Sequence, residues 1–245
     1  MKSKKKKKEI CIPSKKNNYC RLPDPMGMPK TEPTKLNEIT WRIFRIMSEF
    51  VEGFQFLSES NQEVTFFGSA RLKPKTKYYK EAVKLGGMLA KKGYTVITGG
   101  GPGIMEAGNK GASKAGGVSI GLNIQLPNEQ RVNPFVNKSH AFHYFFTRKV
   151  MLSASAQAYV YFPGGFGTLD EFFEIITLIQ TKKMEKIPVV VIGSEFWKGL
   201  FEWVEETLVK KHKTISKEDM KLFKVVDTAE EAMKIISKSK ERTFF

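Results

Sequence analysis

Acidic and basic side chains flank a glycine-rich stretch in the second half of the chain. The stretch YFPGGFGTLDE at residues 161–171 closes on Asp170 and Glu171, and Arg148 and Lys149 precede it. A carboxylate can stabilise an oxocarbenium-like transition state and orient a water, and an arginine can hold phosphate or ribose oxygens. These residue types therefore suit cleavage of the bond between base and ribose in a nucleotide. An ordinary salt bridge, with acids favoured at a helix N-terminus, explains the same residues equally well.

Two glycine-rich loops each follow a predicted strand and precede a predicted helix. The first is Gly99–Gly103 (GGGPG) and the second is Pro163–Thr168 (PGGFGT). Doubly wound folds bind ligands at the carboxyl ends of parallel strands, where the next helix offers unpaired N–H groups to an anion. Turn chemistry alone explains one such loop, but two in one sheet predict a nucleotide or another phosphorylated ligand. Thr168 would add a hydroxyl donor.

Several other classes of site do not fit the chain. Neither loop has the G-x-G-x-x-G fingerprint and there is no Walker A pattern, which disfavours a dehydrogenase or a P-loop kinase. A G-x-S-x-G pattern surrounds Ser119, but it continues as a strand, whereas a nucleophilic serine requires a sharp strand-to-helix turn. His140 and His143 lie in an aromatic segment that reads as extended, which would turn them to opposite faces. We interpret both histidines as packing residues, one of which could lie near the ligand, and expect no metal site.

Short apolar runs alternate with helical patterns from residue 64 onward. Strands alternating with helices of about 10–15 residues are typical of βαβ units with right-handed crossovers. We therefore predict an α/β fold with a doubly wound, Rossmann-like, mostly parallel sheet, helices on both faces and an extra N-terminal helix. The expected strands are 64–67, 94–98, 118–124, 142–146, 158–162, 187–192 and 223–226. The expected helices are 78–92, 104–115, 147–156, a helix ending near 181, 196–210 and one capped by Asp227 or Thr228.

The N-terminal part of the chain divides into two segments. Residues 1–35 hold eleven Lys or Arg and only three acids, which predicts a disordered basic leader. Residues 36–60 show the i, i+3, i+4, i+7 spacing of an amphipathic helix, so their apolar stripe must pack on the main domain or on a neighbouring subunit. We expect residues 36–245 to form one nucleotide-binding domain. The stripe consists of Ile39, Ile43, Ile46, Met47, Phe50, Val51, Phe54 and Leu57.

The composition indicates a globular protein in a reducing compartment. The chain has 245 residues, of which 41% are hydrophobic and 27% charged, and only two cysteines, Cys11 and Cys20. No secretory signal and no apolar run of about 18 residues is evident, so we expect a cytoplasmic protein without a membrane partner. Half of the net charge of +16 lies in the leader. Such a leader can contact nucleic-acid phosphates without sequence preference, although a solubilising tail is the better interpretation.

Four separated motifs resemble the LOG ("Lonely Guy") family, whose members were formerly labelled lysine decarboxylases. The hallmark P-G-G-x-G-T-x-x-E is matched from Pro163 to Glu171. The other motifs are GGGPGIMEAGNKGA (99–112), GLNIQLPNEQRVNP (121–134) and YFFTRKVML (144–152). They occur in the order of the family, and the resemblance covers about residues 64–192. The extra N-terminal helix is similar to that of the longer bacterial members, which are often higher-order oligomers.

The resemblance implies a phosphoribohydrolase that cleaves nucleoside 5′-monophosphates into free base and ribose 5-phosphate, with no metal or organic cofactor. It places the catalytic roles on Arg148 and Glu171 and, together with the apolar first helix, implies at least a homodimer with sites close to the subunit boundary. The family's substrate-binding positions correspond here to Glu129, Lys149, Gly164, Gly165, Phe166, Gly167, Thr168, Leu169, Asp170 and Thr177. Loop geometry and the resemblance together add Gly100, Gly101, Gly103 and Glu106 as phosphate or ribose contacts.

The preferred base stays open at this point. Plant-like members prefer cytokinin riboside monophosphates and also accept AMP, but many of them carry GGGS where this chain has Gly101-Pro102-Gly103. Hydrolysis of purine monophosphates in general is therefore at least as well supported as cytokinin formation. An alternative from another class is a non-catalytic nucleotide-binding or carrier protein, because a fold alone does not determine function.

Overall fold

The computed structural model describes residues 12–13, 20–21, 35–125 and 132–239. Within the N-terminal leader, the two-residue strands β1 (Ile12–Pro13) and β2 (Cys20–Arg21) pair antiparallel. The expected disorder of the remaining leader and its expected contacts with nucleic acid lie outside the described residues.

A seven-stranded sheet forms the centre of the protein, in the order β6-β5-β4-β3-β7-β8-β9. Every neighbouring pair in this sheet is parallel, which confirms the predicted doubly wound architecture and goes beyond "mostly parallel". The strands are β3 (Glu63–Phe67), β4 (Thr95–Thr98), β5 (Ser119–Ile124), β6 (Lys138–Phe142), β7 (Ala158–Tyr161), β8 (Val189–Ile192) and β9 (Lys224–Val226).

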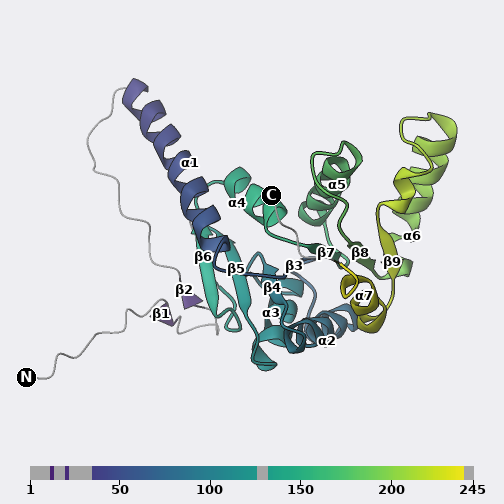
Figure 1. The fold of residues 1–245 in the computed structure, drawn as a ribbon, viewed down its shortest axis with the longest axis horizontal. Coiled ribbons are helices and arrows are strands. Elements are labelled where there is room, and N and C mark those ends of the chain that lie inside the picture. Colours follow the sequence, from purple (N-terminus) through teal and green to yellow (C-terminus); the bar gives the residue numbers. More distant parts are fainter. Residues whose placement is uncertain (1–11, 14–19, 22–34, 126–131, 240–245) are drawn as a thin grey trace, which may run out of the picture.

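Helices cover both faces of this sheet (Figure 1). One hydrophobic core joins α2, α3 and α7 to one face, and a second joins the end of α1, α4, α5 and α6 to the other. The α-helices are α1 (Lys35–Leu57), α2 (Lys77–Lys91), α3 (Ile104–Lys114), α4 (Phe145–Ala154), α5 (Phe166–Gln180), α6 (Ser194–Trp203) and α7 (Ala229–Ile236). The α6 helix continues as the π-helix η1 (Val204–Lys211), and the 3-10 turn η2 (Asp219–Lys221) precedes β9.

The direction of strand addition reverses between β3 and β7. From β3 the chain adds β4, β5 and β6 on one side, and it then returns to add β7, β8 and β9 on the other. Ligands of doubly wound sheets bind at such a switch point, beyond the carboxyl ends of the strands. The loops that follow β3, β4 and β7 converge there, because the Ser69 N–H donates to Pro163 O and the Ile104 N–H donates to Ser69 O.

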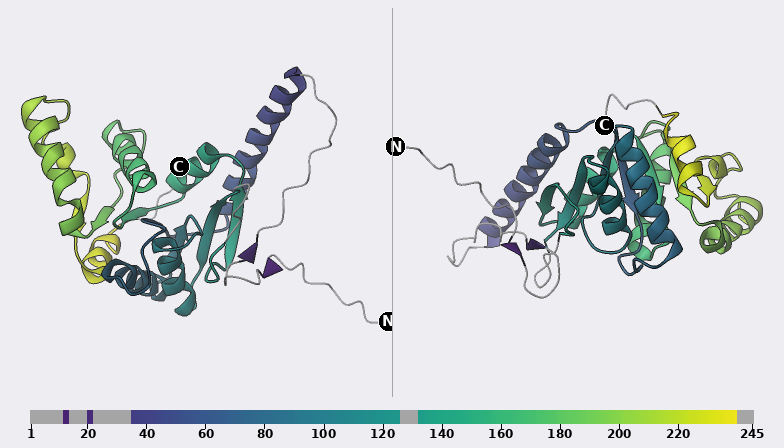
Figure 2. Two further views of the ribbon diagram at one scale, coloured as in Figure 1. Left: turned by 180° about the vertical axis from the view of Figure 1, so that it is seen from behind. Right: turned by 90° about the horizontal axis from the view of Figure 1, so that it is seen from below.

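The first helix is only partly covered. Its C-terminal half packs on the sheet through Phe50, Phe54 and Leu57, as the stripe predicted. Its N-terminal half projects beyond α4 (Figures 1 and 2), so that Ile39 and Ile43 remain more than half exposed. The described part of the chain contains no helix that combines the length and apolarity needed to cross a bilayer.

One predicted strand was wrong. We expected a strand at 142–146, but β6 ends at Phe142, and Phe145 and Phe146 begin α4 with exposed rings. The aromatic run has the composition of a strand, but it does not pair: β6 pairs with β5 through residues 138–142. The other boundaries agree within a few residues, and Thr228 caps α7 in a capping box with Glu231.

Candidate active site

The second glycine loop leads from β7 directly into α5. The α5 helix begins at Phe166, and its N-cap Gly165 has no side chain to cap it. The first N–H groups of a helix have no intrahelical acceptor, and the helix dipole favours an anion beside them. The N-terminus of α5 lies at the switch point of the sheet. This geometry suits the phosphate-binding role predicted for Gly165 and Gly167.

Glu171 lies in the second turn of α5, with its carboxyl group largely buried. Its Oε2 atom is buried and accepts no hydrogen bond from the described residues. Burial raises the pKa of Glu171 to about 8, and the neighbouring carboxylate of Glu174 raises it too, against the opposing effects of Lys149 and Arg148. A carboxyl group that is buried, unpaired and perturbed in this way marks a candidate functional residue.

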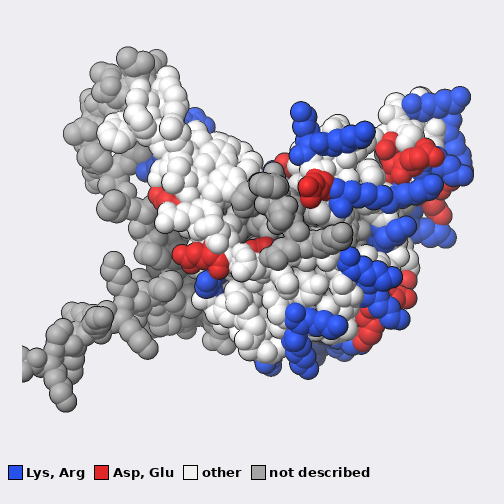
Figure 3. Space-filling view, viewed as in Figure 1, with Lys and Arg blue, Asp and Glu red and all other residues white. Residues whose placement is uncertain are grey.

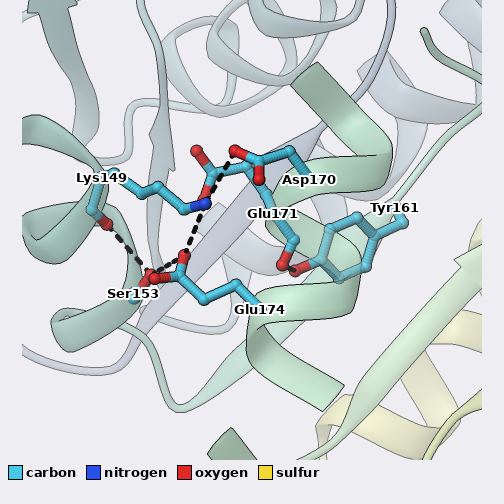
Figure 4. A network of polar contacts seen from close by, with 6 residues as sticks. All are labelled: Lys149, Ser153, Tyr161, Asp170, Glu171 and Glu174. Atoms are coloured by element: carbon cyan, nitrogen blue, oxygen red, sulfur yellow. Dashed lines mark hydrogen bonds and ion pairs between the residues drawn. The ribbon is translucent and has the colours of Figure 1, made fainter. Parts of the chain in front are cut away.

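Lys149 joins α4 to α5 through two carboxylates (Figure 4). Its Nζ lies 2.7 Å from Asp170 Oδ2 and 3.6 Å from Glu174 Oε2. The Ser153 hydroxyl donates to Glu174 Oε2 at 3.1 Å. Partial burial lowers the pKa of Lys149, but the hydrogen bond to Asp170 and the nearby carboxylates outweigh it and raise that pKa. Asp170 is therefore neutralised by Lys149 and acts as an ion-pair partner, which leaves Glu171 as the unpaired acid.

Arg148 approaches the same region from α4. Its Nε donates to Leu122 O at 2.7 Å, which fixes the guanidinium against the end of β5. Burial lowers the pKa of Arg148, whereas the charge of Glu171 raises it. The two groups interact electrostatically but form no direct ion pair. Within the described part of the chain the Arg148 side chain donates only to Leu122 O, which leaves its other N–H groups for a ligand.

The first glycine loop packs against the guanidinium of Arg148. A Cβ on Gly99 would overlap the guanidinium, so only glycine leaves the space that Arg148 occupies. Asn133 holds the loop by donating from its side-chain amide to Gly100 O and Gly101 O, each at 3.1 Å. Gly100 and Gly101 thus line the same region as Arg148, with their carbonyls turned towards Asn133.

Gly103 and Glu106 both have contacts with other residues of the protein. Gly103 adopts a positive φ of 69°, and a Cβ there would overlap Ser69 O, so the fold requires glycine at this position. Glu106 Oε1 accepts a hydrogen bond from the Tyr79 hydroxyl at 2.6 Å. The contacts predicted between these two residues and a phosphate or ribose remain predictions.

The other predicted binding residues lie along α5. Thr168 is buried over Gly164, whereas Phe166 is 92% exposed at the tip of the loop. Leu169 packs towards the core formed by α4 and α5. Thr177 lines a groove of about 420 Å³ along α5, together with Asp170, Phe173, Glu174 and Leu178. Glu129 lies outside the described residues.

The residues set aside from the sequence have structural roles. Ser119 is buried in β5 and accepts a hydrogen bond from Asn109 Nδ2 at 2.8 Å, so it is no nucleophile elbow. The His140 ring packs between Phe56 and Phe142, as predicted for a packing residue. The same prediction was wrong for His143, which follows the end of β6 and is exposed beside the Tyr144 ring. No cluster of three or more His, Cys, Asp or Glu side chains that could hold a metal occurs among the described residues.

The sequence did not identify two residues that organise the site. Asn133 holds the first glycine loop, and Glu49 of α1 contacts the start of α4. Glu49 had a detectable signal, because it interrupts the apolar stripe between Ile46 and Phe50. A charge on the buried face of a helix usually has a specific partner.

The comparison with known proteins decides the family. The family described as "Possible lysine decarboxylase", the older label of the LOG proteins, matches residues 105–236, more than half of the 245-residue chain. The chain belongs to the LOG family. The cytokinin riboside 5′-monophosphate phosphoribohydrolase of Rhodococcoides fascians is 26% identical over 155 residues, which cover 61% of this chain and 77% of that protein.

Solved structures support the fold of this LOG family member. The X-ray structure of a structural-genomics target has a TM-score of 0.55 and 26% identity, covering 72% of this chain and 99% of that one. The molybdenum cofactor carrier protein of Chlamydomonas reinhardtii has a TM-score of 0.54 and 22% identity, covering 72% and 96%. The second likeness concerns the fold alone. Proteins named for different functions therefore share this fold.

Proposed function

We propose that this protein hydrolyses the N-glycosidic bond of nucleoside 5′-monophosphates and releases free base and ribose 5-phosphate. The observation that carries the proposal is the buried Glu171 carboxyl, whose Oε2 accepts no hydrogen bond from the described residues and which interacts electrostatically with Arg148 without a direct ion pair. Membership of the LOG family and the phosphoribohydrolase from Rhodococcoides fascians support the same reaction.

The 5′-phosphate would bind at the N-terminus of α5. A Cβ on Gly165 or on Gly167 would meet nothing within 4 Å, so the protein leaves open space over this turn. Backbone N–H groups and the helix dipole favour a phosphate there. The free N–H donors of Arg148 would hold ribose or phosphate oxygens from the opposite side.

The reaction would proceed through a transition state with positive charge on the ribose. As the bond from C1′ to the base nitrogen breaks, its electron pair leaves with the base, and a water oxygen bonds to C1′. Ionised Glu171 would stabilise the developing charge and accept a proton from the water. The departing base takes up a proton from solvent, and Glu171 returns its own proton to solvent, so that the carboxylate is regenerated. A buried carboxylate is effective in this role because the low local dielectric strengthens its interaction with the cationic sugar.

The base would lie along the groove that α5 lines. Phe173 and Thr177 line this groove, and the exposed ring of Phe166 lies at the N-terminal end of the same helix. Aromatic rings stack on the faces of purines with little preference among them. We therefore propose AMP and other purine monophosphates as substrates, with cytokinin riboside monophosphates among the compounds to be tested.

Product analysis tests this proposal. The protein is incubated with AMP, GMP, CMP, UMP and isopentenyladenosine monophosphate, and the products are separated by chromatography. We expect release of free base and ribose 5-phosphate, and loss of both in Glu171→Gln and Arg148→Ala variants that remain folded. Saturable AMP binding without any turnover would instead assign the chain as a nucleotide carrier.

A further inference from the structure

Glu49 forms a buried connection between α1 and the helix that carries Arg148. The residue is only 9% exposed although its side chain ends in a carboxyl group. Its Oε1 accepts a hydrogen bond from the His143 N–H at 2.6 Å, and its Oε2 accepts from the Tyr144 N–H at 3.3 Å and from the Thr147 hydroxyl at 2.5 Å. One carboxyl group thus contacts three donors at the start of α4.

Glu49 plays the part that the N3 acid has in a capping box, because it accepts a hydrogen bond from the N–H of the N-cap residue Tyr144 and from that of His143 before it. The N-cap residue of α4 is Tyr144, which provides no side-chain cap. Orphan N–H groups at a helix start are normally satisfied by a Ser, Thr, Asp or Asn at the N-cap itself. Here the acceptor comes from a helix almost a hundred residues earlier in the chain, so the start of α4 depends on α1.

The same turn of α4 sets the position of Arg148. Arg148 follows Thr147 directly, and its N–H donates to Tyr144 O at 3.3 Å. Its Nε reaches Leu122 O only if α4 is placed correctly relative to β5. Gly53 provides a second contact, because a Cβ there would press against the Met151 side chain, so α1 and α4 pack closely.

We propose that Glu49 is a positioning residue. It accepts hydrogen bonds from the start of α4 and thereby holds the Arg148 guanidinium in place beside Gly99. The inference rests on the proposed function for its effect on turnover, but its structural part is independent of any activity. On this proposal the extra N-terminal helix α1, although half of it projects from the domain, supports a residue of the candidate site.

The test compares Glu49→Ala and Glu49→Gln with Glu52→Ala as a matched control. Glu52 lies one turn further along α1, is exposed and accepts a hydrogen bond from Ser48. Four quantities are measured in each variant: the thermal unfolding midpoint, kcat for AMP, KM for AMP, and the solvent exchange rate of the Arg148 Nε–H. The nuclear magnetic resonance signal of this N–H is assigned with Arg148→Lys.

We expect Glu49→Ala to lower kcat by about 10- to 100-fold, the cost of misplacing a group by about 1 Å, and to speed the exchange of the Arg148 Nε–H. Glu49→Gln retains one acceptor oxygen and should lie between Glu49→Ala and wild type, whereas Glu52→Ala should match wild type. If Glu49→Ala does not fold, Glu49→Gln decides by the same two readouts.

The deciding variant could instead show a lower unfolding midpoint with unchanged kcat and unchanged exchange of the Arg148 Nε–H. That result would mean that Glu49 only stabilises the fold, and it would overturn the inference. If wild type turns over no nucleotide, the proposed function fails, but the exchange of the Arg148 Nε–H still tests the positioning role. Faster exchange in that case supports it, and unchanged exchange overturns it.

Discussion

Arg148 and Glu171 approach each other from α4 and α5 at the end of the sheet without forming a direct ion pair. The adjacent pair, Lys149 and Asp170, does make contact at 2.7 Å. The neighbouring charges therefore differ in role, since Lys149 and Asp170 neutralise each other and join the two helices. Arg148 and Glu171 retain unused hydrogen-bonding capacity, which is the state expected of groups that await a ligand.

Replacing Glu171 should stabilise the protein at alkaline pH. Burial raises the pKa of this carboxyl to about 8, so the folded state holds its proton more tightly than the unfolded chain does. The stability contributed by the protonated form is fully present below about pH 4.5 and is lost as the pH rises to about 8. We expect Glu171→Gln to raise the free energy of unfolding by about 1–3 kcal/mol at pH 9, with little change at pH 4.5.

Thermal or urea unfolding at the two pH values checks this expectation. The matched control is Glu185→Gln, in the exposed loop before β8, which should change the stability little at either pH. Equal stability of Glu171→Gln and wild type at pH 9 would mean that Glu171 is not buried in the way described.

The rate of hydrolysis should rise with pH through the titration of Glu171. If the ionised carboxylate acts, kcat/KM should increase with pH and level off above about pH 8. The charge of Glu174 raises the pKa of Glu171, so Glu174→Gln should move the midpoint of the profile to lower pH. A rate that falls through the same range would show that the protonated form is active, as a general acid that protonates the base.

Three alanine substitutions in the second glycine loop should separate folding from binding. A Cβ on Gly164 would overlap the Thr168 side chain, so Gly164→Ala should lower the unfolding midpoint. A Cβ on Gly165 or Gly167 meets nothing within 4 Å, and neither residue has a positive φ. We expect Gly165→Ala and Gly167→Ala to fold normally but to raise KM for AMP about tenfold or more, because the methyl group enters the space proposed for the phosphate. An unchanged KM in both variants would place the phosphate elsewhere.

Self-association should involve the exposed apolar surface of α1 and α4. In Figure 3 this side carries few charges, whereas Lys and Arg gather towards α2, α5 and α6. Trp41 is 66% exposed and Phe44 is 58% exposed on α1, and Phe145 is 64% exposed on α4. We propose a second copy of the chain as the partner, because an isologous contact covers the same apolar patch on both copies at once.

Light scattering over a range of protein concentrations measures the assembly. We expect at least a dimer for wild type and a smaller species for the double variant Trp41→Glu and Phe44→Glu, which leaves the buried half of α1 intact. A wild-type monomer at all concentrations would contradict the proposal.

Much of the fold follows from local patterns in the sequence. Alternating apolar runs and helical periodicities predicted the parallel sheet, and the position of each glycine loop after a strand predicted that both loops lie at one edge. The approach of Arg148 and Glu171 from two sides also followed from their order around β7. Each of these signals is carried by neighbouring residues, which is why they can be detected without a structure.

The contacts that fine-tune the site could not be predicted in this way. Glu49 and Thr147 are 98 positions apart, and Asn133 reaches Gly100 and Gly101 across about 30 positions. Side-chain contacts over such separations leave no periodicity. The strand expected at 142–146 failed for a related reason, because its aromatic side chains favour strands while the pairing of β6 with β5 ends at Phe142.

The measurement that tests the central claim most directly is the stoichiometry of products from AMP. Wild type and Glu171→Gln are incubated with AMP at pH 8.5, and adenine and ribose 5-phosphate are quantified over time. We predict that wild type releases the two products in a one-to-one ratio and that Glu171→Gln, folded and still able to bind AMP, is slower by about a thousandfold or more. Equal rates in the two proteins, or no product from wild type with any nucleoside monophosphate, would contradict the account.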